Sequence, residues 1–221
     1  MIVAIVPVKD ISKAKSRLRC IDTHTRIEIV KAMLRDVLHA YTSSRYVDRT
    51  VLVTPSLSID VVEVVKSFNV DVVQDDGSGQ IEAYNRALKT VSDSHRFDAV
   101  FFGVADTPFI SGTDVDVIAE FFEKGFDVVL TPSIDGGTNM MLQRYPLMVE
   151  LMHGRNSFQK HLVRAIQKTT RVYIYSSLTT AIDIDTIDDI MMARQLCMMY
   201  RRELCRIIYG VAPTYKWYGC V

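Results

Sequence analysis

The sequence predicts an α/β domain, with a mostly parallel central sheet between two layers of helices. Short apolar segments rich in β-branched residues alternate with longer segments whose apolar residues recur at helical spacing, and the first five segments follow the order β-α-β-α-β. The strand-like segments are short and continuously apolar, which is typical of strands buried on both faces. A chain of 221 residues can build one such domain with a sizeable core, and we expect residues 1–221 to form a single domain.

The elements can be placed in chain order from their apolar patterns, caps and prolines. A first strand is expected at residues 2–6, before Pro7. Further strands are expected at residues 50–54, 70–73, 99–104, 127–130 and 172–175, and helices at residues 22–41, 59–68, 80–91, 111–124 and 157–167, with Ser111 and Ser157 as caps. A long C-terminal helix is expected from Thr186 to Tyr209. Its methionine-rich surface suits a homodimer contact, and ordinary core packing explains it equally well.

Composition limits the partners. Lys plus Arg equals Asp plus Glu at 26 each, so no overall field favours nucleic acid or an anionic membrane surface. No apolar run approaches the roughly 18 residues that a membrane helix needs, and no basic segment followed by an apolar one opens the chain. We therefore expect a soluble cytoplasmic protein that binds neither nucleic acid nor membrane.

The four cysteines show no metal-binding spacing. If Cys197 and Cys205 share one helix, eight residues of helical rise place them roughly 12 Å apart, which is too far for a disulfide. Reduced thiols are the expectation.

A basic loop follows the first strand. Lys9, Lys13, Lys15 and Arg17 come directly after Pro7, at the carboxyl end of that strand, where open α/β sheets bind ligands. The loop could bind the phosphates of a nucleotide, or it could be a solvated basic surface. The chain has no G-x-x-x-x-G-K-[ST] loop and no G-x-G-x-x-G after the first strand, so the sequence favours neither a P-loop NTPase nor a dinucleotide oxidoreductase.

Acidic residues stand at two later positions. Asp106 follows the strand at 99–104, and Asp183 and Asp185 would project to the same side if residues 182–185 are extended. Carboxylates at strand ends could hold Mg²⁺, which typically uses one or two of them together with phosphate oxygens. The alternatives are that Asp106 starts a turn before Pro108 and that the later aspartates only charge a helix N-terminus.

Two glycine-bearing turns open helices. Gly79 and Gln80 start the helix at 80–91, and Gly154 precedes the helix capped by Ser157. Such turns can present backbone N–H groups to an anion or a base edge, although plain loops would have the same composition.

Several of these segments resemble one family. The segment VPVKDISKAKSRL closely resembles the opening motif of the 2-phospho-L-lactate guanylyltransferases of coenzyme F420 biosynthesis, nucleotidyltransferases with a nucleotide-diphospho-sugar-transferase-like fold. The run Asp135–Asn139, DGGTN, matches that family fully and is the most specific short match. GRNSFQKH is similar to the family's G-P-G-S-F-x-x-H, and ADTP to its A-D-L-P, while Gln80 and Ile81 stand where Leu and Asn are usual.

The resemblance, which runs from Ile2 to about Leu196, implies an activity and a set of site residues. The activity would be guanylyl transfer from GTP to (2S)-2-phospholactate, giving (2S)-lactyl-2-diphospho-5′-guanosine and pyrophosphate, with Mg²⁺ as cofactor. The implied residues are Lys15, Arg17 and Asp106 for catalysis; Lys9, Gly79 and Gln80 for the nucleotide; Thr138, Gly154 and Ser157 for the acceptor; and Asp106, Asp183 and Asp185 for the metal. His161 is interpreted as structural.

Two other functions remain compatible with the sequence. The same fold could act on another acceptor, such as phosphoenolpyruvate, 3-phosphoglycerate, a sugar phosphate or the molybdenum cofactor. The chain could also be a non-catalytic nucleotide-binding module whose methionine-rich helix is the working surface.

Overall fold

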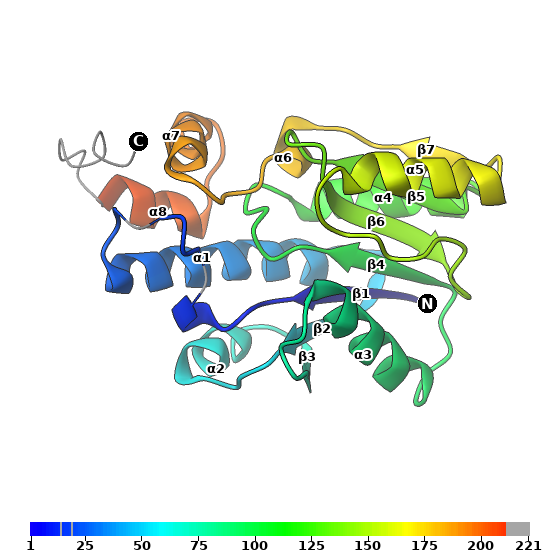
Figure 1. The fold of residues 1–221 in the computed structure, drawn as a ribbon, viewed down its shortest axis with the longest axis horizontal. Helices are drawn as coiled ribbons and strands as arrows, with labels where there is room; N and C mark the ends of the chain where they lie inside the picture. The colour runs from blue at the N-terminus through cyan, green and yellow to red at the C-terminus, as the bar shows by residue number, and fades with distance from the viewer. Residues whose placement is uncertain (14, 19, 211–221) are drawn as a thin grey trace.

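The computed structural model describes residues 1–13, 15–18 and 20–210, and within them the chain forms a seven-stranded sheet (Figure 1). The strands are β1 (Ile2–Pro7), β2 (Val47–Thr54), β3 (Asp71–Gln74), β4 (Ala99–Gly103), β5 (Val128–Pro132), β6 (Thr138–Arg144) and β7 (Val172–Ile174), in the spatial order β3-β2-β1-β4-β6-β5-β7. β6 runs antiparallel to both β4 and β5, and the other pairs are parallel. The predicted mostly parallel sheet is confirmed.

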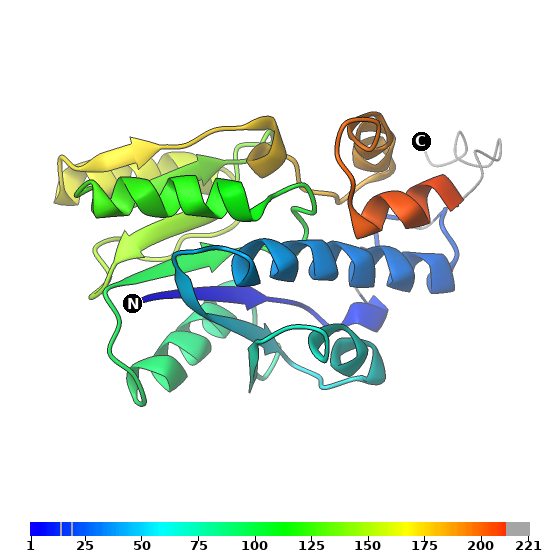
Figure 2. The ribbon, with the colours of Figure 1, turned by 180° about the vertical axis from the view of Figure 1, so that it is seen from behind.

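Helices cover both faces of this sheet. They are α1 (Thr23–Thr42), α2 (Ile59–Val65), α3 (Gln80–Ser92), α4 (Gly112–Glu123), α5 (Ser157–Lys168), α6 (Leu178–Ala181), α7 (Ile187–Leu196) and α8 (Glu203–Gly210), with a short 3₁₀ helix, η1 (Ile11–Lys13). α3 and α5 lie in front of the sheet in Figure 1. The opposite view in Figure 2 has α1 and α4 in front, with α7 and α8 beside them.

The strand pleat explains the two layers. Along β1, Ala4 and Val6 belong to the core under α1, α2, α4, α7 and α8, whereas Val3 and Ile5 belong to the core under α3 and α5. All four side chains are fully buried. A central strand that is buried on both faces must be apolar at every position, which is why the sequence of β1 shows no alternation.

The cap predicted at Ser111 is confirmed, and Asp22 caps α1. The Asp22 carboxylate accepts from the Thr25 N–H at the start of α1, at 3.0 Å. Ser111 caps α4, and the Asp114 carboxylate accepts in return from the Ser111 N–H at 3.0 Å. Such reciprocal caps satisfy N–H groups that have no partner inside the helix.

The prediction of one long C-terminal helix is wrong. The chain forms α7 and α8 instead, and residues 197–202 turn between them. The N–H groups of Glu203 and Leu204 donate to the Asp36 carboxylate of α1, at 2.8 and 3.0 Å, so α1 supplies the cap of α8. A cap from 167 residues away leaves no local sign in the sequence.

This break also overturns the expectation of reduced thiols at Cys197 and Cys205. Because the helix ends at Leu196 and restarts at Glu203, the two Cα atoms lie 5.5 Å apart and the cysteines form a disulfide. That separation is within the usual range for a disulfide, whereas one continuous helix would have prevented the bond.

No helix in the described part of the chain is long and apolar enough to cross a bilayer. The methionines Met191, Met192, Met198 and Met199 are exposed on α7 and the turn after it. A homodimer through this surface stays a prediction.

Candidate active site

A cavity of about 890 Å³ opens at the carboxyl ends of β1 and β4. Its lining includes the residues predicted for the nucleotide, together with two of the predicted metal ligands: Lys9, Lys15, Arg17, Gly79, Gln80, Asp106 and Asp185. Another cavity, of about 680 Å³, lies against α1 and α8 and contains none of the predicted site residues. The sheet therefore brings the basic loop and the acidic residues to one place, although they lie up to 170 positions apart in sequence.

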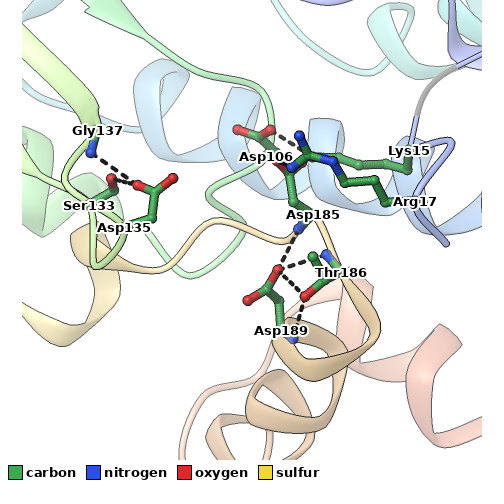
Figure 3. Close-up of polar contacts among 9 residues, drawn as sticks. All are labelled: Lys15, Arg17, Asp106, Ser133, Asp135, Gly137, Asp185, Thr186 and Asp189. Carbon is green, nitrogen blue, oxygen red and sulfur yellow. Dashed lines mark hydrogen bonds and ion pairs between the residues drawn. The ribbon is translucent and has the colours of Figure 1, made fainter. Parts of the chain in front are cut away.

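Lys15 is the centre of this site. Its Nζ donates to Asp106 Oδ2 at 2.6 Å and to Asp185 Oδ1 at 2.5 Å, and only 9% of its side chain is exposed (Figure 3). Burial alone would lower the pKa of the Lys15 ammonium, but the two carboxylates outweigh burial and raise it. Lys15 also has a left-handed backbone, with φ of 54°, a strained conformation of a kind that clusters at functional sites.

Arg17 is held much more loosely. Its Nη1 lies 3.4 Å from Asp185 Oδ2, and 73% of its side chain is exposed. An exposed ion pair of this length contributes little to stability, so the guanidinium can turn towards an incoming anion at small cost. Burial would raise the pKa of Asp185, but the charges of Lys15, Arg17 and Lys9 lower it.

Asp183 lies close to three other carboxylates. Burial, and then the charges of Asp106, Asp135 and Asp185, raise its pKa to about 7. Among the described residues, no cation forms an ion pair with Asp183, in contrast to Asp185. The site thus contains an uncompensated carboxylate beside the Lys15 pair.

The prediction that Asp183 and Asp185 lie on a strand is wrong. The segment between α6 and α7 is irregular and is held by other contacts. Ile184 is fully buried, and its N–H donates to the Asp106 carbonyl at 3.0 Å, which ties the two acidic segments together. Ile182, on the other side of Asp183, is buried as well, with 2% of that residue exposed.

Asp189 fixes the backbone of Asp185. Its Oδ2 accepts from the N–H groups of Asp185 and Thr186, at 2.9 and 2.7 Å, and from the Thr186 hydroxyl at 2.8 Å (Figure 3). Thr186 and Asp189 form a capping box, a local pattern of two residues three apart, whereas the extra bond to Asp185 has no such local pattern. The start of α7 therefore helps to hold an aspartate of the site in place.

The donor chemistry of this cluster fits a hard divalent cation. Asp106, Asp183 and Asp185 offer carboxylate oxygens, the ligands that Mg²⁺ prefers. Within the described residues no three such side chains converge closely enough to hold an ion as they stand. The Lys15 ammonium lies between Asp106 and Asp185, so it balances part of the negative charge that a cation would otherwise balance.

Gln80 is fixed by a residue that the sequence did not single out. Its Nε2 donates to the Tyr84 hydroxyl at 3.2 Å, and that hydroxyl donates to the Gly103 carbonyl at 2.7 Å. Tyr84 is fully buried, and helical spacing of four residues is the only sign of this contact in the sequence. α3 thereby presents Gln80 at the edge of the cavity, close to the end of β4.

The DGGTN turn and the start of α5 contact each other, as the resemblance implied. The Phe158 N–H donates to the Gly136 carbonyl at 3.2 Å, and Ser157 Oγ donates to Thr138 Oγ1 at 3.3 Å. Asp135 accepts from the Ser133 hydroxyl and from the Gly137 N–H, which closes the turn (Figure 3). This turn is therefore well ordered by its own hydrogen bonds.

The prediction that Ser157 caps α5 is wrong. Asn156, with φ of 54°, is the residue at the N-cap of α5, and Ser157 is the first helical residue, whose hydroxyl contacts Thr138 instead. Ser157 and Thr138 are buried, and Gly154 has φ of +124°, a conformation that favours glycine. None of these three residues lines the 890 Å³ cavity, so they form a separate group. Asp183, which is coupled electrostatically to Asp135 of the DGGTN turn and to Asp106, connects the two groups.

Solved structures of other proteins share the fold of this chain. A crystal structure from Desulfovibrio desulfuricans G20, described as a nucleotide-diphospho-sugar transferase, is similar with a TM-score of 0.76 at 16% identity over 95% of this chain and 94% of that one. A cytidylyltransferase from Leptospira borgpetersenii has a TM-score of 0.61 at 15% identity, covering 95% of this chain and 93% of its own. Both similarities are in the fold, and in this chain cations and carboxylates meet at the strand ends of that fold.

The family follows from the sequence comparisons. The profile of the family described as "Guanylyl transferase CofC like" matches residues 2–199, and the chain belongs to this family. The 2-phospho-L-lactate guanylyltransferase of Methanothermobacter thermautotrophicus is 32% identical over 85% of this chain and 81% of its own length. The phosphoenolpyruvate guanylyltransferase of Roseiflexus castenholzii is 31% identical over 87% of both chains. The protein is thus an enzyme and not a non-catalytic module.

Proposed function

We propose that the protein transfers GMP from GTP to (2S)-2-phospholactate, giving (2S)-lactyl-2-diphospho-5′-guanosine and pyrophosphate in coenzyme F420 biosynthesis. The observation that carries the proposal is the Lys15 ammonium, which bridges Asp106 and Asp185 inside the cavity at the strand ends. The name of the methanogen relative supports the choice of GTP and phospholactate.

The basic loop would bind the triphosphate. Lys15 and Lys9 supply localised positive charge, and Arg17 supplies a planar donor that can grip two phosphate oxygens at once. Arg17 is free to do so because its present ion pair is long and exposed. Gly79 and Gln80 line the same cavity and would contact the nucleoside.

Asp106, Asp183 and Asp185 would hold Mg²⁺, which when bound neutralises the charge that develops on the phosphates. Lys15 would turn from the aspartates to the phosphates as the nucleotide enters, because its ammonium needs a negative partner in either state. Its 9% exposure means that it cannot simply move into water. The basic loop and the acidic residues therefore act as one unit.

The acceptor needs no protein nucleophile. A phosphate oxygen of phospholactate, already ionised at neutral pH, would attack the α-phosphorus of GTP while the bond from that phosphorus to the bridging β-phosphate oxygen breaks. One P–O bond forms, one breaks, and pyrophosphate leaves. Thr138, Gly154 and Ser157 would bind the acceptor and aim its phosphate.

A second acceptor is supported by a specific finding. The Roseiflexus relative is named for phosphoenolpyruvate and matches this chain almost as well as the methanogen relative does. Both acceptors are three-carbon acids with a phosphate on the second carbon, and they differ in geometry at that carbon. Discrimination between phospholactate and phosphoenolpyruvate must therefore come from the shape of the binding site around Thr138 and Ser157.

The test is a panel of acceptors with GTP and Mg²⁺, read by pyrophosphate release and by the mass of the product. We expect fastest turnover with phospholactate, and the Asp106→Asn variant serves as the control for contaminating activity. Fastest turnover with phosphoenolpyruvate would establish the second candidate instead. Failure of every three-carbon acid, with a sugar phosphate active, would overturn both.

A further inference from the structure

A buried histidine contacts Thr138, one of the residues proposed to bind the acceptor. His161 lies on α5 and is completely inaccessible to solvent. Its Nδ1 is 2.9 Å from Thr138 Oγ1, and its Nε2 accepts from the Met152 N–H at 2.8 Å. Both nitrogens of the ring are therefore engaged, one by the backbone and one by a residue of the proposed acceptor group.

These two contacts fix the position of the ring proton. A backbone N–H can only donate, so Nε2 must be the unprotonated nitrogen. A neutral imidazole carries one proton, which must then be on Nδ1 and be donated to Thr138 Oγ1. A second proton, on Nε2, would point at the Met152 N–H, and the hydrogen bond between these two nitrogens would be lost. Burial and the charge of Lys160 also lower the pKa of His161, to about 4, which agrees with a neutral ring.

The fixed tautomer determines what the Thr138 hydroxyl can do. Its oxygen accepts from His161, and Ser157 Oγ also donates to it, at 3.3 Å. The single hydroxyl proton of Thr138 is consequently not used by either neighbour. No residue in the described part of the chain accepts that proton, so it is free to be donated to a bound anion.

We propose that His161 is a positioning residue, which keeps the Thr138 hydroxyl as a donor towards the phosphorylated acceptor. The inference rests on the proposed function, in which Thr138 binds that acceptor. His161 does not touch the substrate in this account. It acts through Thr138, and a purely structural histidine would instead affect folding and both substrates alike.

Two substitutions separate the two contacts of the ring. In His161→Asn, the amide nitrogen stands near the position of Nδ1 and can still donate to Thr138, but the Met152 N–H loses its partner. In His161→Gln, the amide oxygen stands near the position of Nε2 and can still accept from Met152, but the donor to Thr138 is lost. We expect the Gln variant to raise the KM for the acceptor about tenfold and the Asn variant to raise it less than about threefold.

The KM for GTP should change less than about twofold in both variants, and circular dichroism and thermal unfolding establish that each is folded. Gln159→Ala, an exposed substitution on the same turn of α5, is the control for changes of this helix. If His161→Gln fails to fold, Thr138→Val, which removes the oriented hydroxyl, should give the same tenfold rise in the KM for the acceptor alone. An acceptor KM for Thr138→Val equal to that of the wild type would overturn the inference.

The outcomes distinguish the two proposals. If wild-type protein transfers GMP to no three-carbon acid, the proposed function fails. If wild-type protein is active but the Asn and Gln variants raise the acceptor KM equally, or raise the KM for GTP as much, the function stands and the positioning role of His161 is refuted.

Discussion

Replacing Asp183 by asparagine should make the metal-free protein more stable at alkaline pH, although it removes a residue of the site. The folded state raises the pKa of Asp183 from 3.8 to about 7, because the carboxylate is partly buried beside Asp106, Asp135 and Asp185. The folded chain thus holds this proton more tightly than the unfolded chain does. The contribution of the protonated Asp183 to the free energy of unfolding is therefore fully present below about pH 4, and it is lost as the pH rises through about 7.

The size of the effect follows from the shift. About three pH units at about 1.4 kcal/mol each set a ceiling of about 4 kcal/mol on the cost of charging Asp183. Asp183 is only half-buried, and solvent screens its neighbours, so we expect about 1–2 kcal/mol. Asp183→Asn should match the wild type near pH 4 and exceed it in free energy of unfolding by that amount at pH 8.

The assay is urea denaturation at several values between pH 4.5 and 8.5 in the presence of a chelator. Asp188→Asn removes one negative charge from the first turn of α7, outside the carboxylate cluster, and is the matched control. Mg²⁺ should stabilise the wild type and not Asp183→Asn, which should also lose most turnover. If Asp183→Asn is less stable than the wild type at pH 8, or if the difference between them does not change with pH, the charge on Asp183 does not destabilise the folded state.

Four further changes test other contacts. Lys15→Ala should raise the KM for GTP or lower kcat at least tenfold, with unchanged circular dichroism, because it removes the buried ammonium that bridges Asp106 and Asp185. Unchanged GTP kinetics would instead indicate that the basic loop is a solvated surface. Arg17→Lys should also impair GTP use, since a point charge does not replace a bidentate donor, and full activity would argue against phosphate binding by Arg17. Ser157→Ala should raise the KM for the acceptor by the equivalent of about 1–2 kcal/mol and leave the KM for GTP unchanged. A change in the KM for GTP alone would instead assign Ser157 to the nucleotide-binding part of the site. Replacing Cys197 and Cys205 by serine should lower the free energy of unfolding by about 2–3 kcal/mol, and equal denaturation curves would contradict this.

The sequence predicts the layers of this fold well, because the signals are local. Continuous apolar runs locate β1 and β4, and a small polar residue just before a helical pattern locates a cap such as Ser111 of α4. It could not predict the break between α7 and α8, since residues 197–202 contain neither glycine nor proline. The cap that Asp36 supplies is a tertiary contact, and the disulfide follows from it.

The site was partly predictable for the same reason. Strand ends placed Lys15 and Asp106 at one edge of the sheet, where they form an ion pair. The sequence could not show that the same ammonium also bridges Asp185, because that depends on an irregular segment. Nor could it show the role of His161, whose tautomer is set by a backbone N–H of a loop nine residues earlier.

Phosphorus NMR of a reaction between GTP and (2S)-2-phospholactate in the presence of Mg²⁺ can follow the transfer of GMP to the acceptor itself. We expect the phospholactate resonance to be replaced by two mutually coupled signals of a new diphosphate, with one equivalent of pyrophosphate. Consumption of GTP to give GMP or GDP without a new pair of coupled signals, or no consumption of GTP with phospholactate or phosphoenolpyruvate, would contradict this expectation.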